Sequence, residues 1–277
     1  MSVRKRVVVL GCGYAGAAVA RLARERGDDV LTHVRSAERA AALRAEGFVV
    51  LEAARIDDAT VARLGIDERT HVVIAFPPDG STDAQLAPQL TGAAAVTYVS
   101  STGVYGDHRG LVDDRTPTAA PSERTAKILA AEQAYRDVGA TVLRCPGIYG
   151  PDRGLHVRVL KGEHRIPGDG TRYLSRIHIE DLAQLVLASG AAGHARGETY
   201  VVGDSEPASQ IDVVRFIAER YGVPLPAHVP LESVHESLRA DRRVDASRAL
   251  EALGVTLRHP TYREGMAPAV TGMLPRP

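Results

Sequence analysis

The sequence predicts an α/β protein built on a doubly wound parallel sheet, with a second, smaller lobe. Short β-branched runs alternate with alanine-rich helical runs over the first half of the chain, at the spacing of strand–helix units. A glycine-rich turn follows the first of these runs and opens a helix. Of the 277 residues, 44% are hydrophobic, which is enough to bury a substantial core and excludes a disordered chain.

The elements of the first half follow in order. Residues 7–10 are all apolar, as in a central parallel strand that is buried on both faces. The helix expected at 16–26 places alanines and a leucine inward and arginines outward, and Gly27 marks its C-terminal end. Further strands are expected at 30–34, 48–51, 71–75, 95–100 and 141–144, with a second helix at 37–46.

The composition changes after Pro146. Glycine and proline become frequent and the apolar runs shorten, while helical runs remain at 180–188 and 211–220. We therefore expect residues 1–150 to form a sheet domain and residues 151–277 to form a smaller lobe that supplies substrate contacts. The lobe is expected to interleave with the sheet domain, including part of 175–200.

Charge and cysteine content narrow the class of protein. Lysine plus arginine equals aspartate plus glutamate at 34 each, so no net field attracts nucleic acid or an anionic membrane. Cys12 and Cys145 lie far apart and form no disulfide framework, which favours a reducing compartment. No apolar stretch approaches the roughly 18–20 residues of a membrane span, and residues 7–10 are too short for a signal peptide. We expect a cytoplasmic protein with neither nucleic acid nor membrane as partner.

The glycine-rich turn carries the first functional signal. Gly11, Gly13 and Gly16 have the G-x-G-x-x-G spacing, directly between a predicted strand and a predicted helix. The first glycine permits the tight turn, the second lets the backbone approach a diphosphate, and the third lets the helix pack against the strand. This context predicts a Rossmann-type dinucleotide-binding site, and a tight turn without a ligand is the alternative. Cys12, inside the turn, is expected to be a small filler.

The second strand indicates which dinucleotide binds. NAD-preferring sites usually carry an acidic residue at the end of this strand, to accept hydrogen bonds from the ribose hydroxyls. Here the strand ends THVRS, with no acid and with Arg35 at its tip. Because a guanidinium pairs well with a 2′-phosphate, we expect NADP(H) to be favoured over NAD(H). The alternative is that Arg35 is a solvated surface charge.

A series of motifs in a familiar order extends over nearly the whole chain. They are SSTGVYG (100–106), VDDRTP (112–117), LRCPGIYGP (143–151), RIHIEDLA (176–183), YVVGD (200–204) and RVDASRALEALG (243–254). With these motifs the chain resembles the extended-type short-chain dehydrogenase/reductase superfamily, the NAD(P)-dependent epimerase/dehydratase group. The tail HPTYREGM (259–266), the pair Pro77–Pro78 and the GxGYxG turn look most like its atypical bacterial branch.

The resemblance implies a catalytic set with one member exchanged. Ser101 and Lys127 stand where the family has its serine or threonine and its lysine, but Glu123 stands where the Y-x-x-x-K unit has its tyrosine. A tyrosine carries the proton that a developing alkoxide needs, whereas a glutamate beside a lysine is ionised at neutral pH. The exchange should cripple ordinary ketone reduction or mark another proton route. By local chemistry, Glu123 and Lys127 are an i,i+4 ion pair of an exposed helix.

Other roles follow from the resemblance alone. Tyr105 and Tyr149 are placed at strand ends facing the cleft, where either could supply a proton, and a packed aromatic is the alternative for each. Thr102 and Gly103 occupy the positions of the dehydratase Asp–Glu pair, so sugar dehydration is not expected. The implied cofactor contacts are Gly11, Gly13, Tyr14, Ala15, Gly16, Arg35, Ser36, Phe76, Pro77, Lys127 and Ile148. The implied substrate contacts are Thr102, Tyr149, Arg153, Arg176 and His178. The basic residues among them would bind phosphates of the substrate, or would alternatively form structural pairs with Glu180 or Asp181.

Two hypotheses of function remain open. The first is an NAD(P)-dependent oxidoreductase or epimerase that acts on a small polar substrate, nucleotide sugars included. The second is a catalytically silent NADP(H)-binding sensor or scaffold. The ten histidines and two cysteines show no metal-ligand spacing, so no metal site is expected. By resemblance, a homodimer would form through helices near 83–90 and 122–137, with Ile128, Ala131, Ala134 and Tyr135 of the second helix as a symmetric seam. The alternative is a monomer that buries this face within itself.

Overall fold

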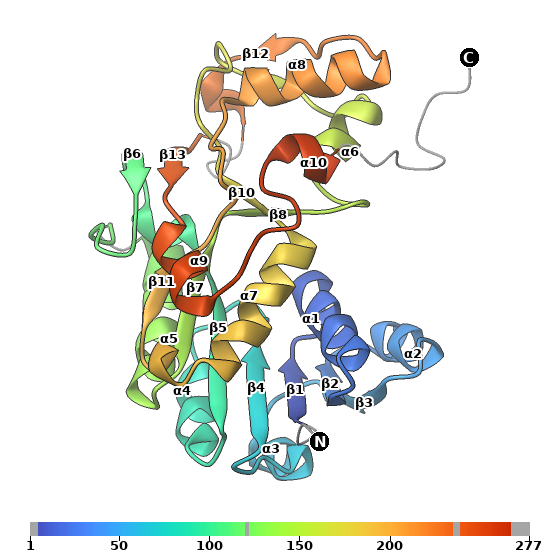
Figure 1. The fold of residues 1–277 in the computed structure, drawn as a ribbon, viewed down its shortest axis with the longest axis vertical. Coiled ribbons are helices and arrows are strands. Elements are labelled where there is room, and N and C mark those ends of the chain that lie inside the picture. Colours follow the sequence, from blue (N-terminus) through green and yellow to red (C-terminus); the bar gives the residue numbers. More distant parts are fainter. Residues whose placement is uncertain (1–4, 120–121, 235–238, 267–277) are drawn as a thin grey trace.

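A computed structural model describes residues 5–119, 122–234 and 239–266 (Figure 1). Seven parallel strands form the central sheet in the order β11-β7-β5-β4-β1-β2-β3, which is the doubly wound arrangement that the sequence predicts. All six predicted strands are confirmed to within one residue. Their bounds are β1 Arg6–Leu10, β2 Asp29–Val34, β3 Val49–Glu52, β4 Thr70–Ile74, β5 Ala95–Ser101 and β7 Thr141–Cys145.

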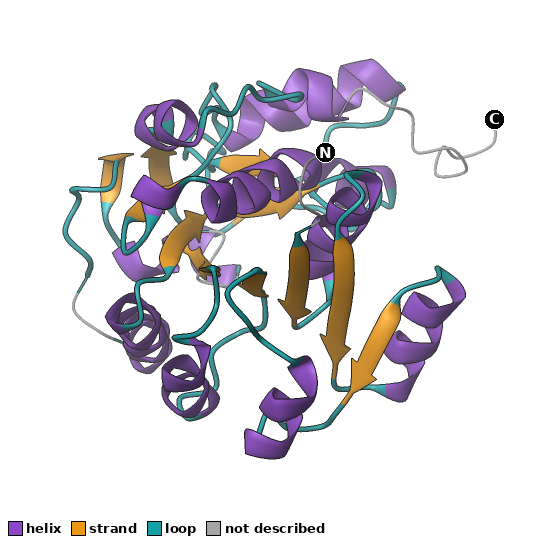
Figure 2. Cartoon of the chain, turned by 60° about the horizontal axis from the view of Figure 1, so that its bottom comes forward, coloured by secondary structure: helices purple, strands orange, loops and turns teal. Residues whose placement is uncertain are grey.

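Helices cover both faces of the sheet (Figures 1 and 2). The core on one face includes buried residues of α1 (Tyr14–Glu25), α2 (Ala37–Ala45), α7 (Ile179–Ala191) and α9 (Ser247–Leu253). The core on the other face includes those of α3 (Asp58–Leu64), α4 (Thr82–Leu86) and α5 (Glu123–Asp137). Parallel strands buried on both faces are apolar throughout, as β1 is.

The seventh strand is a correction to the sequence interpretation, which ended the sheet at its sixth strand. β11 (Thr199–Val201) returns from the second half of the chain and pairs with β7 at the edge of the sheet. Its neighbour α7 packs along α1, so a long segment of the second half belongs to the sheet layer. Three strand residues are too few to show a period, which is why the pattern did not reveal them.

The rest of the second half gathers beyond the carboxyl ends of the strands, at the top of Figure 1. Its core includes Ile166, Val214 and Tyr262. Three short parallel pairs lie outside the seven-stranded sheet, namely β8–β10, β9–β12 and β6–β13, and the first and last of these pair a strand before residue 150 with one from the second half of the chain. The elements here are β6 Arg109–Val112, β8 Gly147–Tyr149, α6 Leu155–Leu160, β9 Ile166–Pro167, β10 Arg176–His178, α8 Gln210–Tyr221, β12 His228–Val229, β13 Asp241–Val244 and α10 Tyr262–Met266.

The proposed dimer seam on α5 is covered by the protein itself. Ala131 and Tyr135 are buried in the core of their own sheet, and the Tyr135 hydroxyl donates to Asp83 Oδ1 at 2.9 Å. Ile128 is buried beneath the turn after β5. These side chains therefore cannot form an interface, and a dimer through the helices near 83–90 and 122–137 would have to use their outer faces. Within the described residues, no helix has the length and apolarity to cross a membrane.

Candidate active site

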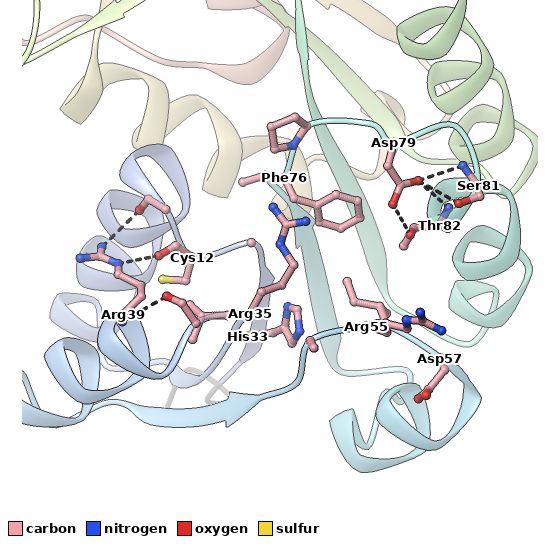
Figure 3. Close-up of a pocket in the computed structure, with 18 of the residues that line it drawn as sticks. Cys12, His33, Arg35, Arg39, Arg55, Asp57, Phe76, Asp79, Ser81 and Thr82 are labelled. Carbon is pink, nitrogen blue, oxygen red and sulfur yellow. Dashed lines mark hydrogen bonds between the residues drawn. The ribbon is translucent and has the colours of Figure 1, made fainter.

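A cavity of about 760 Å³ opens at the carboxyl ends of β1, β2 and β4 (Figure 3). In open parallel sheets this edge is where ligands bind. The glycine turn after β1 forms one wall, and the segment after β4 forms another. The predicted cofactor residues that line the cavity are Gly11, Gly13, Arg35, Ser36, Phe76 and Pro77.

The glycine turn is shaped by close backbone contacts. Gly11 has φ 83°, and a Cβ on it would lie 2.7 Å from the backbone nitrogen of Phe76. A Cβ on Gly16 would lie 2.6 Å from the carbonyl oxygen of Gly11. No side chain caps the N-terminus of α1, which begins at Tyr14, so its first amide groups are directed at the turn. The arrangement is suited to an anion such as a diphosphate.

Three arginines line the cavity at the carboxyl end of β2, and this strand ends without an acidic residue. Arg35 and Arg55 are exposed along it, and Arg39 reaches back to the glycine turn (Figure 3). Arg39 Nε donates to the carbonyl of Cys12 at 3.0 Å and its Nη2 donates to that of Gly13 at 3.3 Å. Neither Arg39 nor Arg55 was predicted from the sequence. Arg39 could have been, because it belongs to the segment RSAER (35–39) that directly follows the second strand.

His33 lies beneath these arginines and is also a residue that sequence reasoning missed. Its Nε2 lies 3.0 Å from the carbonyl of Ala53, so the ring donates there and Nδ1 is left as the acceptor. Burial lowers the pKa of His33, with a smaller contribution from Arg35. The neutral ring therefore offers a buried acceptor in the cavity wall.

Glu123 and Lys127 lie together in the first turns of α5, and Ser101 ends β5; none of the three lines the cavity. Lys127 Nζ donates to Glu123 Oε1 at 2.9 Å, and the hydrogen bond holds the pKa of Glu123 below its usual range. The stem of Lys127 passes Gly80, whose chain neighbours Asp79 and Ser81 line the cavity. The predicted i,i+4 ion pair is thus present, at the edge of the cofactor cavity.

Tyr105 does not face the cavity, and the prediction that it does is wrong. The side chain is fully buried, its hydroxyl donates to the carbonyl of Asp113 at 3.1 Å, and Arg144 Nη1 donates to that hydroxyl at 3.1 Å. Arg144 also binds the fully buried Glu132. Burial raises the pKa of Tyr105, so the residue is a structural member of a buried polar network.

Tyr149 and Arg176, two predicted substrate residues, lie together inside the protein. Arg176 is 5% exposed and Tyr149 3%, and neither Arg176 Nη1 nor the Tyr149 hydroxyl has a hydrogen-bond partner among the described residues. Asp204 lies with them at 4% exposure, and both of its carboxylate oxygens lack such a partner. Burial raises the pKa of Asp204 to about 7, although Arg176 acts against it. Sequence reasoning did not identify Asp204.

The raised pKa gives a prediction for Asp204→Asn. The folded protein holds this proton more tightly than the unfolded chain, so wild-type stability falls as pH rises from about 4 to about 7. Denaturant unfolding should show the variant gaining about 2–4 kcal/mol relative to wild type over that range. Asp169→Asn is the control, because a hydrogen bond from the Thr171 backbone lowers that carboxyl's pKa and reverses the sign. Parallel curves for Asp204→Asn and wild type would contradict the assignment.

His178 caps the N-terminus of α7 and belongs to a second polar group. Its Nδ1 accepts from the amide of Glu180 at 3.3 Å, and its ring lies against that of His259, tilted by 41°, with centroids 3.6 Å apart. His259 Nε2 lies 3.1 Å from Glu180 Oε2, and potential ligand atoms of the three residues lie within 4.8 Å of one another. The expectation that the protein has no metal site stays a prediction.

The remaining predicted residues lie apart from that group. Arg153 is exposed, with its guanidinium 5.0 Å from the ring centre of Tyr14, while Thr102 is buried at the start of the turn after β5. Tyr14 in turn packs against Gly150, because a Cβ on that glycine would lie 2.5 Å from the Tyr14 hydroxyl. The half-buried residues Ala15 and Ile148 pack against the core beneath the glycine turn, on α1 and β8.

Comparison with known proteins supports the Rossmann-type fold. The TrkA-N domain family matches residues 7–92. A functionally unknown conserved protein from Silicibacter pomeroyi DSS is 30% identical, with a TM-score of 0.81 over 96% of this chain and 98% of that one. A protein described as an NAD-dependent epimerase/dehydratase, from Methylobacillus flagellatus, is 25% identical, with a TM-score of 0.76 over 98% and 99%.

Two further proteins are similar at lower identity or over a shorter segment. UDP-glucuronic acid 4-epimerase from Bacillus cereus, solved with NAD, shares the fold at 17% identity and a TM-score of 0.76 over 97% of this chain and 98% of that one. A curated relative from Streptomyces sp, the "3-diazoavenalumate denitrifying reductase", is 29% identical over 169 residues. That match covers 56% of this chain and 55% of the relative, so it spans about half the length of each.

The chain is therefore similar over almost its whole length to a protein described as an NAD-dependent epimerase/dehydratase, and it shares the fold of that group. By the resemblance described above, Glu123 stands at the position of the tyrosine in the Y-x-x-x-K unit.

Proposed function

We propose that this protein is an NADP(H)-dependent reductase that delivers hydride to a small polar substrate. The observation that carries the proposal is the cavity between the glycine turn and three arginines. The diphosphate would rest on the turn at Gly11 and Gly13, and a 2′-phosphate would meet Arg35, with Arg39 and Arg55 adding to the positive field. When bound, the cofactor supplies a hydride, which no protein side chain can supply.

The chain's own residues would orient the reactants. Lys127 projects from the rim beside Gly80 and would hold the nicotinamide ribose, as the family resemblance implies. Ser101, whose Oγ accepts from the amide of Gly103 at 3.0 Å, keeps its own proton available to orient a substrate atom. The curated relative's name, which describes a reductase acting on a diazo compound, favours reduction over epimerisation.

A nucleotide-linked substrate is a narrower form of the proposal. Some structural neighbours were solved with UDP-glucose or UDP-glucuronic acid together with NAD. In this chain Arg153 is the predicted phosphate contact that is exposed, while Arg176 is buried beside Asp204. We therefore assign any diphosphate contact to Arg153.

We also keep the cytoplasm as the expected location, since Cys12 and Cys145 are both free and buried.

A silent NADP(H)-binding protein is the second candidate, and the exposed Glu123–Lys127 pair is the observation that favours it. Purified protein is incubated with NADPH and a panel of sugar nucleotides, small carbonyl compounds and organic cations. Oxidation of NADPH above the rate without protein supports the reductase. Tight NADPH binding with no oxidation on any substrate class supports the silent module.

Arg35→Ala tests the cofactor assignment. A hydrogen bond to a charged group contributes about 1.5–3 kcal/mol, so the variant should bind NADPH about 10- to 100-fold more weakly and NADH almost unchanged. Calorimetric titration measures both affinities. Arg215→Ala, which removes the same charge from the exposed face of α8, is the control and should alter neither. Equal losses for both nucleotides in Arg35→Ala would contradict the preference for NADP(H).

A further inference from the structure

The position of the family tyrosine carries a negative charge in this protein. Glu123 lies in the first turn of α5, and 87% of its side chain is exposed. Lys127 Nζ contacts one of its oxygens at 2.9 Å. The lowered pKa that results from this hydrogen bond means that Glu123 is ionised at neutral pH. It is therefore an acceptor and an anion, and cannot donate a proton.

The family resemblance places this charge where a substrate would meet the cofactor. The stem of Lys127 passes 3.6 Å from where a Cβ of Gly80 would be, in the segment that borders the cavity. A Cβ on Gly103 would lie 3.2 Å from Ser101 Oγ and 3.8 Å from Ile128, the residue after Lys127. The first turns of α5 thus pack beside the segment that borders the cavity and beside the turn after β5.

Neither tyrosine that the resemblance offers as a proton donor replaces the missing one. Tyr105 is fully buried, with its hydroxyl bound to Asp113 and Arg144. The hydroxyl of Tyr149 is turned toward α10, since a Cβ on Gly265 would lie 2.1 Å from it. A serine hydroxyl such as that of Ser101, or water, is a much weaker acid than a phenol held beside a lysine. A carbonyl substrate would thus have only a poor proton donor for its alkoxide.

We propose that the substrate is an organic cation which becomes neutral when it accepts hydride, and that the Glu123 carboxylate is its counter-charge. This deepens the proposed reductase function and rests on it. For an iminium ion the C=N π bond opens, the new C–H bond forms at carbon, and the electron pair returns to nitrogen. For an aryl diazonium ion the new C–H bond replaces C–N, and neutral N₂ leaves. The dihydronicotinamide is oxidised in both cases, and neither reaction consumes a proton.

The same charge discriminates against other substrates. Lys127 contacts only Oε1 of the exposed carboxylate, so Oε2 can meet a cation, whereas a neutral carbonyl gains no comparable advantage there. In the hydride-transfer step, carbonyl reduction requires one proton for each NADPH, whereas reduction of these cations requires none. The tertiary amine formed from the iminium ion is basic and takes up a proton from water at neutral pH, so the proton count is informative only for the diazonium ion, whose products are not bases. For that substrate, proton uptake separates the two chemistries independently of rate.

The test uses matched pairs of probes with the full chain and NADPH. The cations are 2-methyl-3,4-dihydroisoquinolinium and benzenediazonium, and their neutral partners are α-tetralone and benzaldehyde. Each rate is corrected for reaction without protein, and a pH indicator counts protons. Binding of phenyltrimethylammonium, which cannot be reduced, is measured by calorimetry with NADP⁺ present. The variants are Glu123→Gln, Glu123→Tyr and, as control, Asp137→Asn, which removes an exposed charge from the other end of α5.

We expect wild type and Asp137→Asn to reduce a cation at least about tenfold faster than its neutral partner, and to reduce benzenediazonium with no proton uptake. Glu123→Gln should lose about tenfold in both cation turnover and phenyltrimethylammonium affinity, and Glu123→Tyr should gain carbonyl reduction with one proton consumed. Carbonyl reduction by wild type that equals or exceeds cation reduction would overturn the inference and leave the reductase standing. If no probe is reduced, equal phenyltrimethylammonium affinity in wild type and Glu123→Gln overturns it.

Discussion

Alanine at position 16 is expected to weaken dinucleotide binding by about 100-fold or more. The added Cβ would lie 2.6 Å from the carbonyl oxygen of Gly11 and 3.0 Å from a methyl group of Val9, so the start of α1 has to move away from β1. A misplacement of about 1 Å can cost two orders of magnitude in catalytic rate, and we expect a comparable loss where backbone amides have to meet a diphosphate. The same overpacking should lower the free energy of unfolding by about 1–3 kcal/mol.

Calorimetry with NADPH and denaturant unfolding measure the two effects of Gly16→Ala separately. Gly92→Ala is the matched control, because no atom lies within 4 Å of its added Cβ and its φ is not in the left-handed region. If Gly16→Ala bound NADPH as tightly as wild type, the glycine turn would not be the diphosphate site.

Glu132→Ala should have the largest effect on stability, about 3–5 kcal/mol. Glu132 is fully buried on α5 and accepts from three partners: Ser100 Oγ at 2.6 Å, Arg144 through both Nε and Nη2 at 3.0 and 2.7 Å, and Arg136 at 3.2 Å. Its removal leaves the buried guanidinium of Arg144 without its counter-charge. The loss arises from the unpaired charge more than from the contacts themselves.

A double replacement separates the cost of leaving Arg144 unpaired from the cost of losing the contacts of Glu132. Glu132→Met combined with Arg144→Met removes both charges while keeping the volume, and should recover part of the stability lost in Glu132→Ala. Urea unfolding with a common slope measures all three proteins. A loss below about 1 kcal/mol in Glu132→Ala would show that water or a neighbouring group solvates Arg144.

The sequence predicted those parts of the fold that depend on local pattern. Residues 7–10 could be assigned as a central strand because burial on both faces requires an unbroken apolar run. The glycine turn could be assigned because its three positions are constrained by backbone contacts within a few residues, as at Gly16. β11 could not be assigned, because three residues carry no period and the strand is defined by its partner β7.

Site residues were predicted only where a motif placed them next to a strand end. Arg55 reaches the cavity because the loop before α3 passes beside it, which is a long-range property of the fold. Arg176 was expected at the substrate, but the return of the chain through Asp204 and α10 buries it. The burial of Tyr105 could not be predicted either, because its hydrogen-bond partner Arg144 is 39 residues away in sequence.

Arg39 has a consequence for how the cofactor enters. Its two hydrogen bonds to the carbonyls of Cys12 and Gly13 brace the glycine turn from the second strand–helix unit, before any ligand is present. A turn that is already ordered loses little conformational freedom on association, so the entropic penalty is small. The rate of cofactor capture should then be governed by diffusional encounter and electrostatic steering, and not by a slow rearrangement of the turn.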